Sequence, residues 1–168
     1  PKSLLYNWQI EIKKWLPLFE PCLFKDIETK SKITNLNFSN SYNIYVISYS
    51  EAPKVKEIIE KNNIDVDLLI ADEAHKLRNE TSQLNNIIGK IKRTRTWLLT
   101  GTPLERDSKD IKNILTLLYP KKALAFSQLE DVSLKSNLKQ NSLRRLKKEV
   151  LHELPETSKH LITLEMSH

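Results

Sequence analysis

The chain has 168 residues, a length of about one domain or slightly more, and its 39% hydrophobic and 29% charged residues are typical of a folded protein. A net charge of +6 permits a nucleic-acid partner without establishing one. One cysteine, Cys22, excludes an intrachain disulfide framework, and two glycines, Gly89 and Gly101, cannot form a glycine-rich phosphate loop. No apolar run approaches the ~20 residues of a membrane helix, so we expect an intracellular protein without a membrane partner.

The N-terminal segment predicts one helix and one short strand. Apolar residues recur at helical spacing over 8–16, with Asn7 as the N-cap and Pro17 as the stop. A short strand is expected at 22–27, and the polar stretch 31–41 is typical of a loop.

From residue 43 onward, strands and helices alternate. We expect strands at 43–49, 65–71 and 96–100, and helices at 51–62, 81–92 and 109–119. Such alternation predicts an α/β fold with a parallel sheet flanked by helices. Helices rich in Lys, Arg and Leu are expected over 121–154, followed by a strand at 160–164. The chain is accordingly divided into a sheet-containing part, 1–120, and a helical part, 121–168.

Two adjacent carboxylates, Asp72 and Glu73, follow the buried strand at 65–71. In an open α/β sheet, ligands bind beyond the carboxyl ends of the strands. One carboxylate there could hold Mg²⁺ with phosphate oxygens, and the other could orient or deprotonate an attacking water. The same residues also suit the start of a helix, where acidic groups interact favourably with the dipole.

A second polar loop follows the strand at 96–100. Thr100 and Thr102 carry hydroxyl groups, and Gly101 between them permits a sharp turn. The two loops could converge on one ligand, although a strand-to-helix turn capped by threonine is the simpler interpretation.

Together the two loops indicate a family. The stretch 65–107, with DEAH at 72–75 and TGTP at 100–103, resembles motifs II and III of superfamily-two helicase-like ATPases, above all the Swi/Snf-type DNA translocases. Three other blocks resemble the same family, in the same order: 1–17 (motif Ia), 46–49 (motif Ib) and 143–155 (the signature that ends the first lobe).

The resemblance implies part of the first RecA-like lobe of a P-loop NTPase, within a two-lobe motor that hydrolyses Mg-ATP and moves along double-stranded DNA. It implies that Asp72 holds the Mg²⁺ of the nucleotide and that Glu73 activates the water. His75 and the loop of Thr100, Gly101 and Thr102 would couple the nucleotide state to the grip on DNA. The partners implied are duplex DNA, a DNA-bound protein complex and the second lobe of the parent protein.

Basic and hydroxyl side chains supply the expected DNA contacts. The resemblance places Lys2, Ser3, Ser48 and Tyr49 in blocks that touch the DNA backbone, which fits donors that bind phosphate without reading sequence. Arg144 and Arg145 lie in the densest basic run, either on a solvated helix face or at the lobe junction facing the cleft or the DNA.

Other residues carry plainer expectations. Four basic residues before the strand at 96–100 are expected to be a solvated cluster: Lys90, Lys92, Arg93 and Arg95. Three tryptophans in apolar patterns are expected to pack in the core: Trp8, Trp15 and Trp97.

The chain departs from the family in three respects. The Walker A motif and the second lobe would lie outside this piece, and Arg106 stands where the family usually has Asn. We therefore expect the chain alone to hydrolyse ATP poorly. Two alternatives stay open: a non-enzymatic RecA-like module that binds DNA or a protein, and, less supported, a metal-dependent nuclease using Asp72, Glu73 and His75. The expected location is the cytoplasm or nucleoid in a bacterium and the nucleus in a eukaryote.

Overall fold

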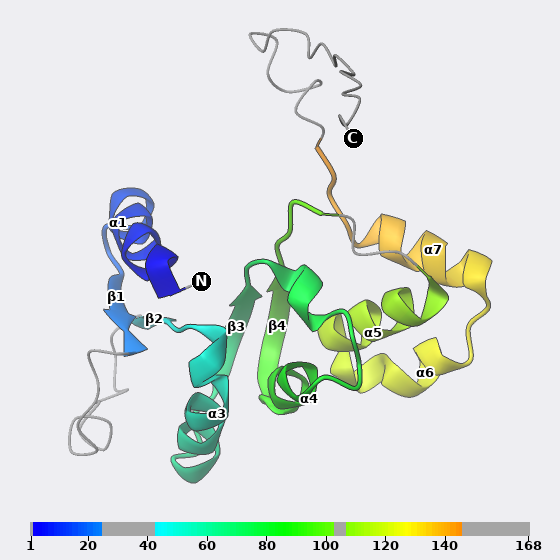
Figure 1. Cartoon of the computed structure of the whole chain (residues 1–168), viewed down its shortest axis with the longest axis horizontal. Helices are drawn as coiled ribbons and strands as arrows, with labels where there is room; N and C mark the ends of the chain where they lie inside the picture. Colours follow the sequence, from blue (N-terminus) through cyan, green and yellow to red (C-terminus); the bar gives the residue numbers. More distant parts are fainter. Residues whose placement is uncertain (1, 25–42, 103–106, 146–168) are drawn as a thin grey trace, which may run out of the picture.

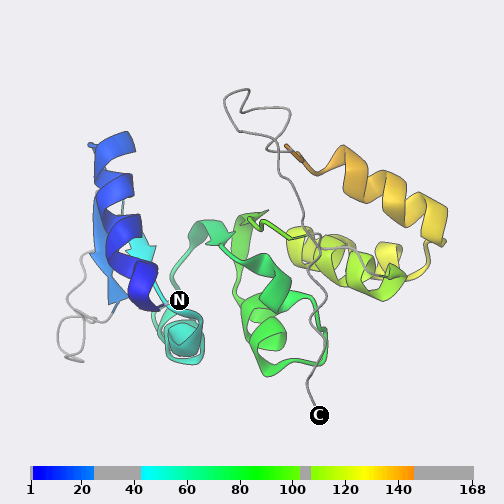
Figure 2. The same cartoon turned by 45° about the horizontal axis from the view of Figure 1, so that its top comes forward.

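The computed structural model describes residues 2–24, 43–102 and 107–145. Figures 1 and 2 both show residues 2–24 and 43–46 at one end of the molecule and residues 108–140 at the other, with residues 66–98 between them. Several predicted features lie outside the described residues: the end of the strand at 22–27, the loop at 31–41, Arg106, the residues from 146 onward of the last family block and the strand at 160–164.

The N-terminal part consists of a helix packed on a pair of parallel strands. Its elements are η1 (Lys2–Leu4), α1 (Leu5–Trp15), β1 (Glu20–Leu23) and β2 (Asn43–Val46). Helix α1 begins before the predicted Asn7, with Leu4 as N-cap, and the amide of its C-cap Leu16 donates to the Ile12 carbonyl. The predicted start was wrong because η1 leads directly into the helix, so the chain turns before Asn7.

The central part holds the second parallel pair and the helices beside it. Its elements are η3 (Tyr49–Glu51), α3 (Ala52–Lys61), β3 (Val66–Ala71), η4 (Ala74–Leu77), α4 (Gln83–Lys90) and β4 (Arg93–Leu98). Strands β3 and β4 pair in register from Val66 opposite Arg93 to Ala71 opposite Leu98. Strand β4 begins at Arg93, earlier than the predicted residue 96, because Arg93 and Arg95 also pair with β3. The hydrophobic pattern did not include these polar residues.

The C-terminal part of the described chain consists mainly of helices. Its elements are α5 (Ser108–Leu118), η5 (Pro120–Lys122), α6 (Ala123–Ser127) and α7 (Asp131–Gln140). Helix α5 packs against β4 on one side and against α6 and α7 on the other. It therefore links two buried apolar clusters, one beside the β3–β4 pair and one formed with α6 and α7. The division of the chain at residue 120 stays a prediction.

The α/β class with parallel strands and flanking helices is confirmed. Within the described residues, the hydrogen-bonded ladders form two separate pairs, β1–β2 and β3–β4. The prediction that the tryptophans are buried was wrong, since Trp15 and Trp97 are 70% and 57% exposed. Trp97 and its register partner Ile70 lie on one face of the β3–β4 pair, and the opposite face carries Leu69 and Leu98 of the core beside α4.

Candidate active site

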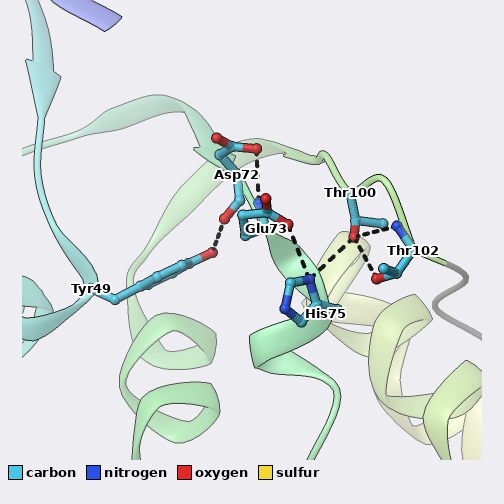
Figure 3. Close-up of polar contacts among 6 residues, drawn as sticks. All are labelled: Tyr49, Asp72, Glu73, His75, Thr100 and Thr102. Carbon is cyan, nitrogen blue, oxygen red and sulfur yellow. Dashed lines mark hydrogen bonds and ion pairs between the residues drawn. The ribbon is translucent and has the colours of Figure 1, made fainter. Parts of the chain in front are cut away.

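The two polar loops predicted to converge do lie side by side. Strands β3 and β4 are parallel, so their carboxyl ends meet at one edge of the pair. Beyond that edge two more backbone hydrogen bonds continue the pairing, from the Leu99 amide to the Ala71 carbonyl and from the Ala74 amide to the Leu99 carbonyl, both 2.9 Å. The acidic loop and the threonine loop therefore form one site (Figure 3).

The acidic pair adopts a tight, strained turn. One carboxylate oxygen of Asp72 accepts the backbone amide of Glu73 at 2.8 Å. Glu73 has φ +52°, the left-handed region, which costs a residue with a side chain roughly 1–3 kcal/mol. The element that follows, η4, is a 3-10 helix of four residues, and Glu73 makes no side-chain capping bond to it. The pair thus does stand at the start of a short helix, with Glu73 as its N-cap, but no side-chain capping bond accounts for its acidic groups.

A chain of contacts joins the acidic pair to the threonine loop. His75 Nδ1 lies 3.1 Å from a carboxylate oxygen of Glu73 and 3.4 Å from the hydroxyl of Thr100. The same hydroxyl lies 3.2 Å from that of Thr102 and accepts its backbone amide at 3.3 Å. The side chains of Glu73 and His75 are 40% and 36% exposed, so a ligand can reach both.

Gly101 is not needed for the sharp turn that its position between the two threonines predicted. No glycine among the described residues has a positive φ, and a Cβ added at Gly101 would meet no atom within 4 Å. The turn at 100–102 therefore does not need glycine in this structure, because ordinary backbone angles already bring the two threonine hydroxyls together.

Tyr49 lies at the acidic pair. Its hydroxyl donates to the backbone carbonyl of Asp72 at 2.7 Å, and burial together with the carboxylates of Asp72 and Glu73 raises the pKa of Tyr49 to about 12. The neighbouring Ser48 is buried and belongs to a capping box, in which its amide and hydroxyl both donate to Glu51 at 2.9 and 2.7 Å.

The other predicted DNA contacts lie elsewhere. Lys2 and Ser3 belong to η1, where Ser3 is exposed. Arg144 and Arg145 are exposed and follow α7 in a segment without helical structure, which contradicts the helix predicted there. The acidic pair itself contacts Tyr49 through the Asp72 carbonyl and His75 through the Glu73 carboxylate.

A buried amide pair that the sequence analysis missed holds the turn after the acidic pair. The Asn85 side chain donates to the Leu77 carbonyl at 2.6 Å and to Asn113 Oδ1 at 3.0 Å. Asn113 donates in turn to the carbonyls of Leu77 and Arg78 at 2.9 and 2.7 Å. The signal was present: Asn113 interrupts the apolar face of α5, and a polar residue at such a position must find partners.

The acidic pair fits a magnesium ion bound together with phosphate. Within the described residues no group of three or more His, Cys, Asp or Glu side chains could hold a metal by itself. Mg²⁺, however, is commonly held by one or two carboxylates that act with phosphate oxygens and water. Asp72 and Glu73, partly exposed at a strand end, provide that donor set.

The comparisons of the sequence with known proteins all indicate the same family. The model of the SNF2-related domain family matches residues 1–168. The SWI/SNF-related matrix-associated actin-dependent regulator of chromatin subfamily A member 1 of Mus musculus is 34% identical over 123 residues, and helicase SWR1 of Mycosarcoma maydis is 29% identical over 202. These alignments cover 71% and 99% of this chain but only 12% and 11% of the relatives, so the chain spans a small part of their length.

One solved structure shares the fold. The SWI2/SNF2 ATPase core of Sulfolobus solfataricus, described in complex with dsDNA, matches with a TM-score of 0.68 and 24% identity. The match covers 92% of this chain and 35% of that one. At this identity, the likeness concerns the fold.

Proposed function

The chain belongs to the SNF2-related domain family, and we propose that it forms part of the first RecA-like lobe of an ATP-driven motor that moves along double-stranded DNA. The names of its relatives, a chromatin regulator and a helicase, support this proposal. So does the fold shared with an ATPase core described in complex with dsDNA.

The convergence of the acidic and threonine loops carries the proposal. Asp72 would hold the Mg²⁺ of the nucleotide, which neutralises phosphate charge when bound. Glu73 would orient the attacking water and accept its proton. His75, 3.1 Å from Glu73 and 3.4 Å from Thr100, would transmit the nucleotide state to the threonine loop.

Basic and hydroxyl groups would bind the DNA backbone. Lys2, Ser3, Arg144 and Arg145 can donate to phosphates without reading the sequence, as a motor that moves along DNA requires. Such binding weakens as salt is added, because bound phosphates release counterions. The second RecA-like lobe of the parent protein and a DNA-bound protein complex would be the further partners.

The 168 residues by themselves would be a poor ATPase. They contain no glycine-rich phosphate loop, so the β- and γ-phosphates would lack their cradle of amides and lysine. The parent protein would act in the nucleoid of a bacterium or the nucleus of a eukaryote. No helix among the described residues has the length and hydrophobicity to cross a membrane.

The test is ATP turnover by the full-length parent protein, with and without duplex DNA. We expect duplex DNA to stimulate wild-type turnover and Glu73→Gln to abolish it while ATP still binds, because glutamine keeps the shape of the side chain but cannot accept a proton. Glu80→Gln, the same change at an exposed residue nearby, is the matched control and should keep full activity. Turnover of Glu73→Gln within about twofold of wild type would reject the role of Glu73.

One alternative has an observation in its favour. The lack of a phosphate loop in these residues is what a RecA-like module that binds DNA or protein without hydrolysing ATP would show. Wild-type parent protein that binds duplex DNA but does not turn over ATP would support this alternative.

A further inference from the structure

We propose that Tyr49 is a positioning residue, whose hydroxyl group holds the Asp72 backbone so that the Asp72 carboxylate keeps its geometry for Mg²⁺. The inference rests on the proposed function of the acidic pair. It also gives Tyr49 a part other than the contact with the DNA backbone expected from its sequence block.

The first observation is a hydrogen bond between distant parts of the chain. The Tyr49 hydroxyl donates to the Asp72 carbonyl at 2.7 Å, across 23 positions of sequence. That carbonyl belongs to the peptide group that joins Asp72 to Glu73, whose backbone is left-handed. Figure 3 shows the tyrosine reaching the acidic pair from the opposite side to His75 and the threonines.

The second observation is that the tyrosine is itself held in place. The Ser48–Glu51 capping box fixes the η3 turn on which Tyr49 lies. The ring packs against the apolar cluster beside the β3–β4 pair, and the ammonium of Lys76 lies 6.0 Å from its centre. A side chain anchored in this way can act as a fixed donor, because little conformational freedom remains to be lost.

The third observation distinguishes the positioning role of Tyr49 from a contact with DNA. A tyrosine hydroxyl has one hydrogen to donate, and its remaining capacity is to accept. Phosphate oxygens in the DNA backbone also accept. The Tyr49 hydroxyl therefore cannot donate to a DNA phosphate without giving up Asp72, and the geometry favours the bond that is present.

The test compares Tyr49→Phe with wild type in the full-length parent protein. The change removes the hydroxyl and keeps the ring, so it removes one hydrogen bond worth ~0.5–1.5 kcal/mol. We expect the Mg²⁺ concentration for half-maximal turnover to rise about two- to tenfold, and the affinity for Mn²⁺ in the presence of ATP to fall by the same factor. The affinity for duplex DNA and its salt dependence should stay within about twofold of wild type.

Tyr119→Phe is the matched control. The Tyr119 hydroxyl also makes one hydrogen bond, to Asn141 Oδ1 at 2.6 Å, in the helical C-terminal part. This variant loses the same group in another region, so its Mg²⁺ dependence and Mn²⁺ affinity should match wild type.

Two results would overturn the inference. One is weaker binding of duplex DNA by Tyr49→Phe with unchanged Mg²⁺ dependence, which would make the hydroxyl a DNA contact. The other is Mn²⁺ affinity that is the same in wild type and both variants. Failure of the proposed function is distinguishable, because wild-type protein without turnover would reject the motor while the Mn²⁺ affinities would still test Tyr49.

Discussion

Arg93 provides the sharpest test of how the structure is held together. Its guanidinium group donates to the carbonyls of Ile88, Gly89 and Ile91 at 2.9, 3.2 and 2.7 Å, and to the Leu117 carbonyl at 2.7 Å. These carbonyls lie at the C-terminal ends of α4 and α5. Backbone carbonyls lack intrahelical partners there, and the helix dipole favours a positive charge. One side chain thus joins two helices to the start of β4.

The expected cost of Arg93→Ala follows from these contacts. A hydrogen bond to a charged donor contributes ~1.5–3 kcal/mol, but the contributions do not add fully, and ordering the side chain costs about 2 kcal/mol. Burial also lowers the pKa of the guanidinium, although it stays charged. Because the group is only half-buried, water can replace part of what is lost. We expect a loss of about 3 kcal/mol, at the lower end for removing one partner of a buried charged contact.

The assay is hydrogen exchange, measured by mass spectrometry on the full-length parent protein. Peptides that cover α4, β4 and α5 should exchange on the order of a hundredfold faster in Arg93→Ala, since about 3 kcal/mol of local stability is lost. Arg95→Ala, an exposed arginine on the same strand, is the control and should change exchange by no more than about twofold. Equal effects of the two substitutions would refute the reasoning, because the carbonyl contacts would then contribute nothing beyond a surface charge.

Two further predictions concern a buried and a partly buried side chain. Asn113→Ala should destabilise the protein by about 2–4 kcal/mol, because the Arg78 carbonyl loses its donor, the Leu77 carbonyl keeps only Asn85, and Asn85 loses its acceptor on Asn113. Faster exchange of peptides around η4 would show this, and exchange equal to wild type would contradict it. Burial, and to a smaller extent the charge of the neighbouring Cys22, raises the pKa of the Tyr45 hydroxyl above its ordinary value near 10. A folded-state pKa above the unfolded one contributes stability that is present below pH ~10 and lost as pH rises through the folded pKa. The urea midpoint of Tyr45→Phe should therefore fall less steeply than that of wild type above pH ~10, and parallel curves would count against the shift.

Several features were predictable because they depend on neighbouring residues in the sequence. The alternation of strands and helices follows from hydrophobic periodicity, and it correctly predicted the α/β class. Asp72 and Glu73 directly follow an apolar run, so their place at a strand end could be inferred from local sequence, although the strand is less buried than predicted, with Ile70 50% exposed. The family was correctly identified from the same blocks. The roles of individual site residues stay proposals that the experiments above address.

Other features were decided by the tertiary structure alone. Arg93 looked like part of a solvated basic cluster until the ends of α4 and α5 met at the start of β4. Trp97 looked like a core residue, but in the described part of the chain the core beside α4 lies on the other face of its strand. Tyr49 reached the acidic pair across 23 positions of sequence. Local patterns determine which elements form, whereas long-range hydrogen bonds depend on where the ends of those elements meet, and periodicity does not encode that.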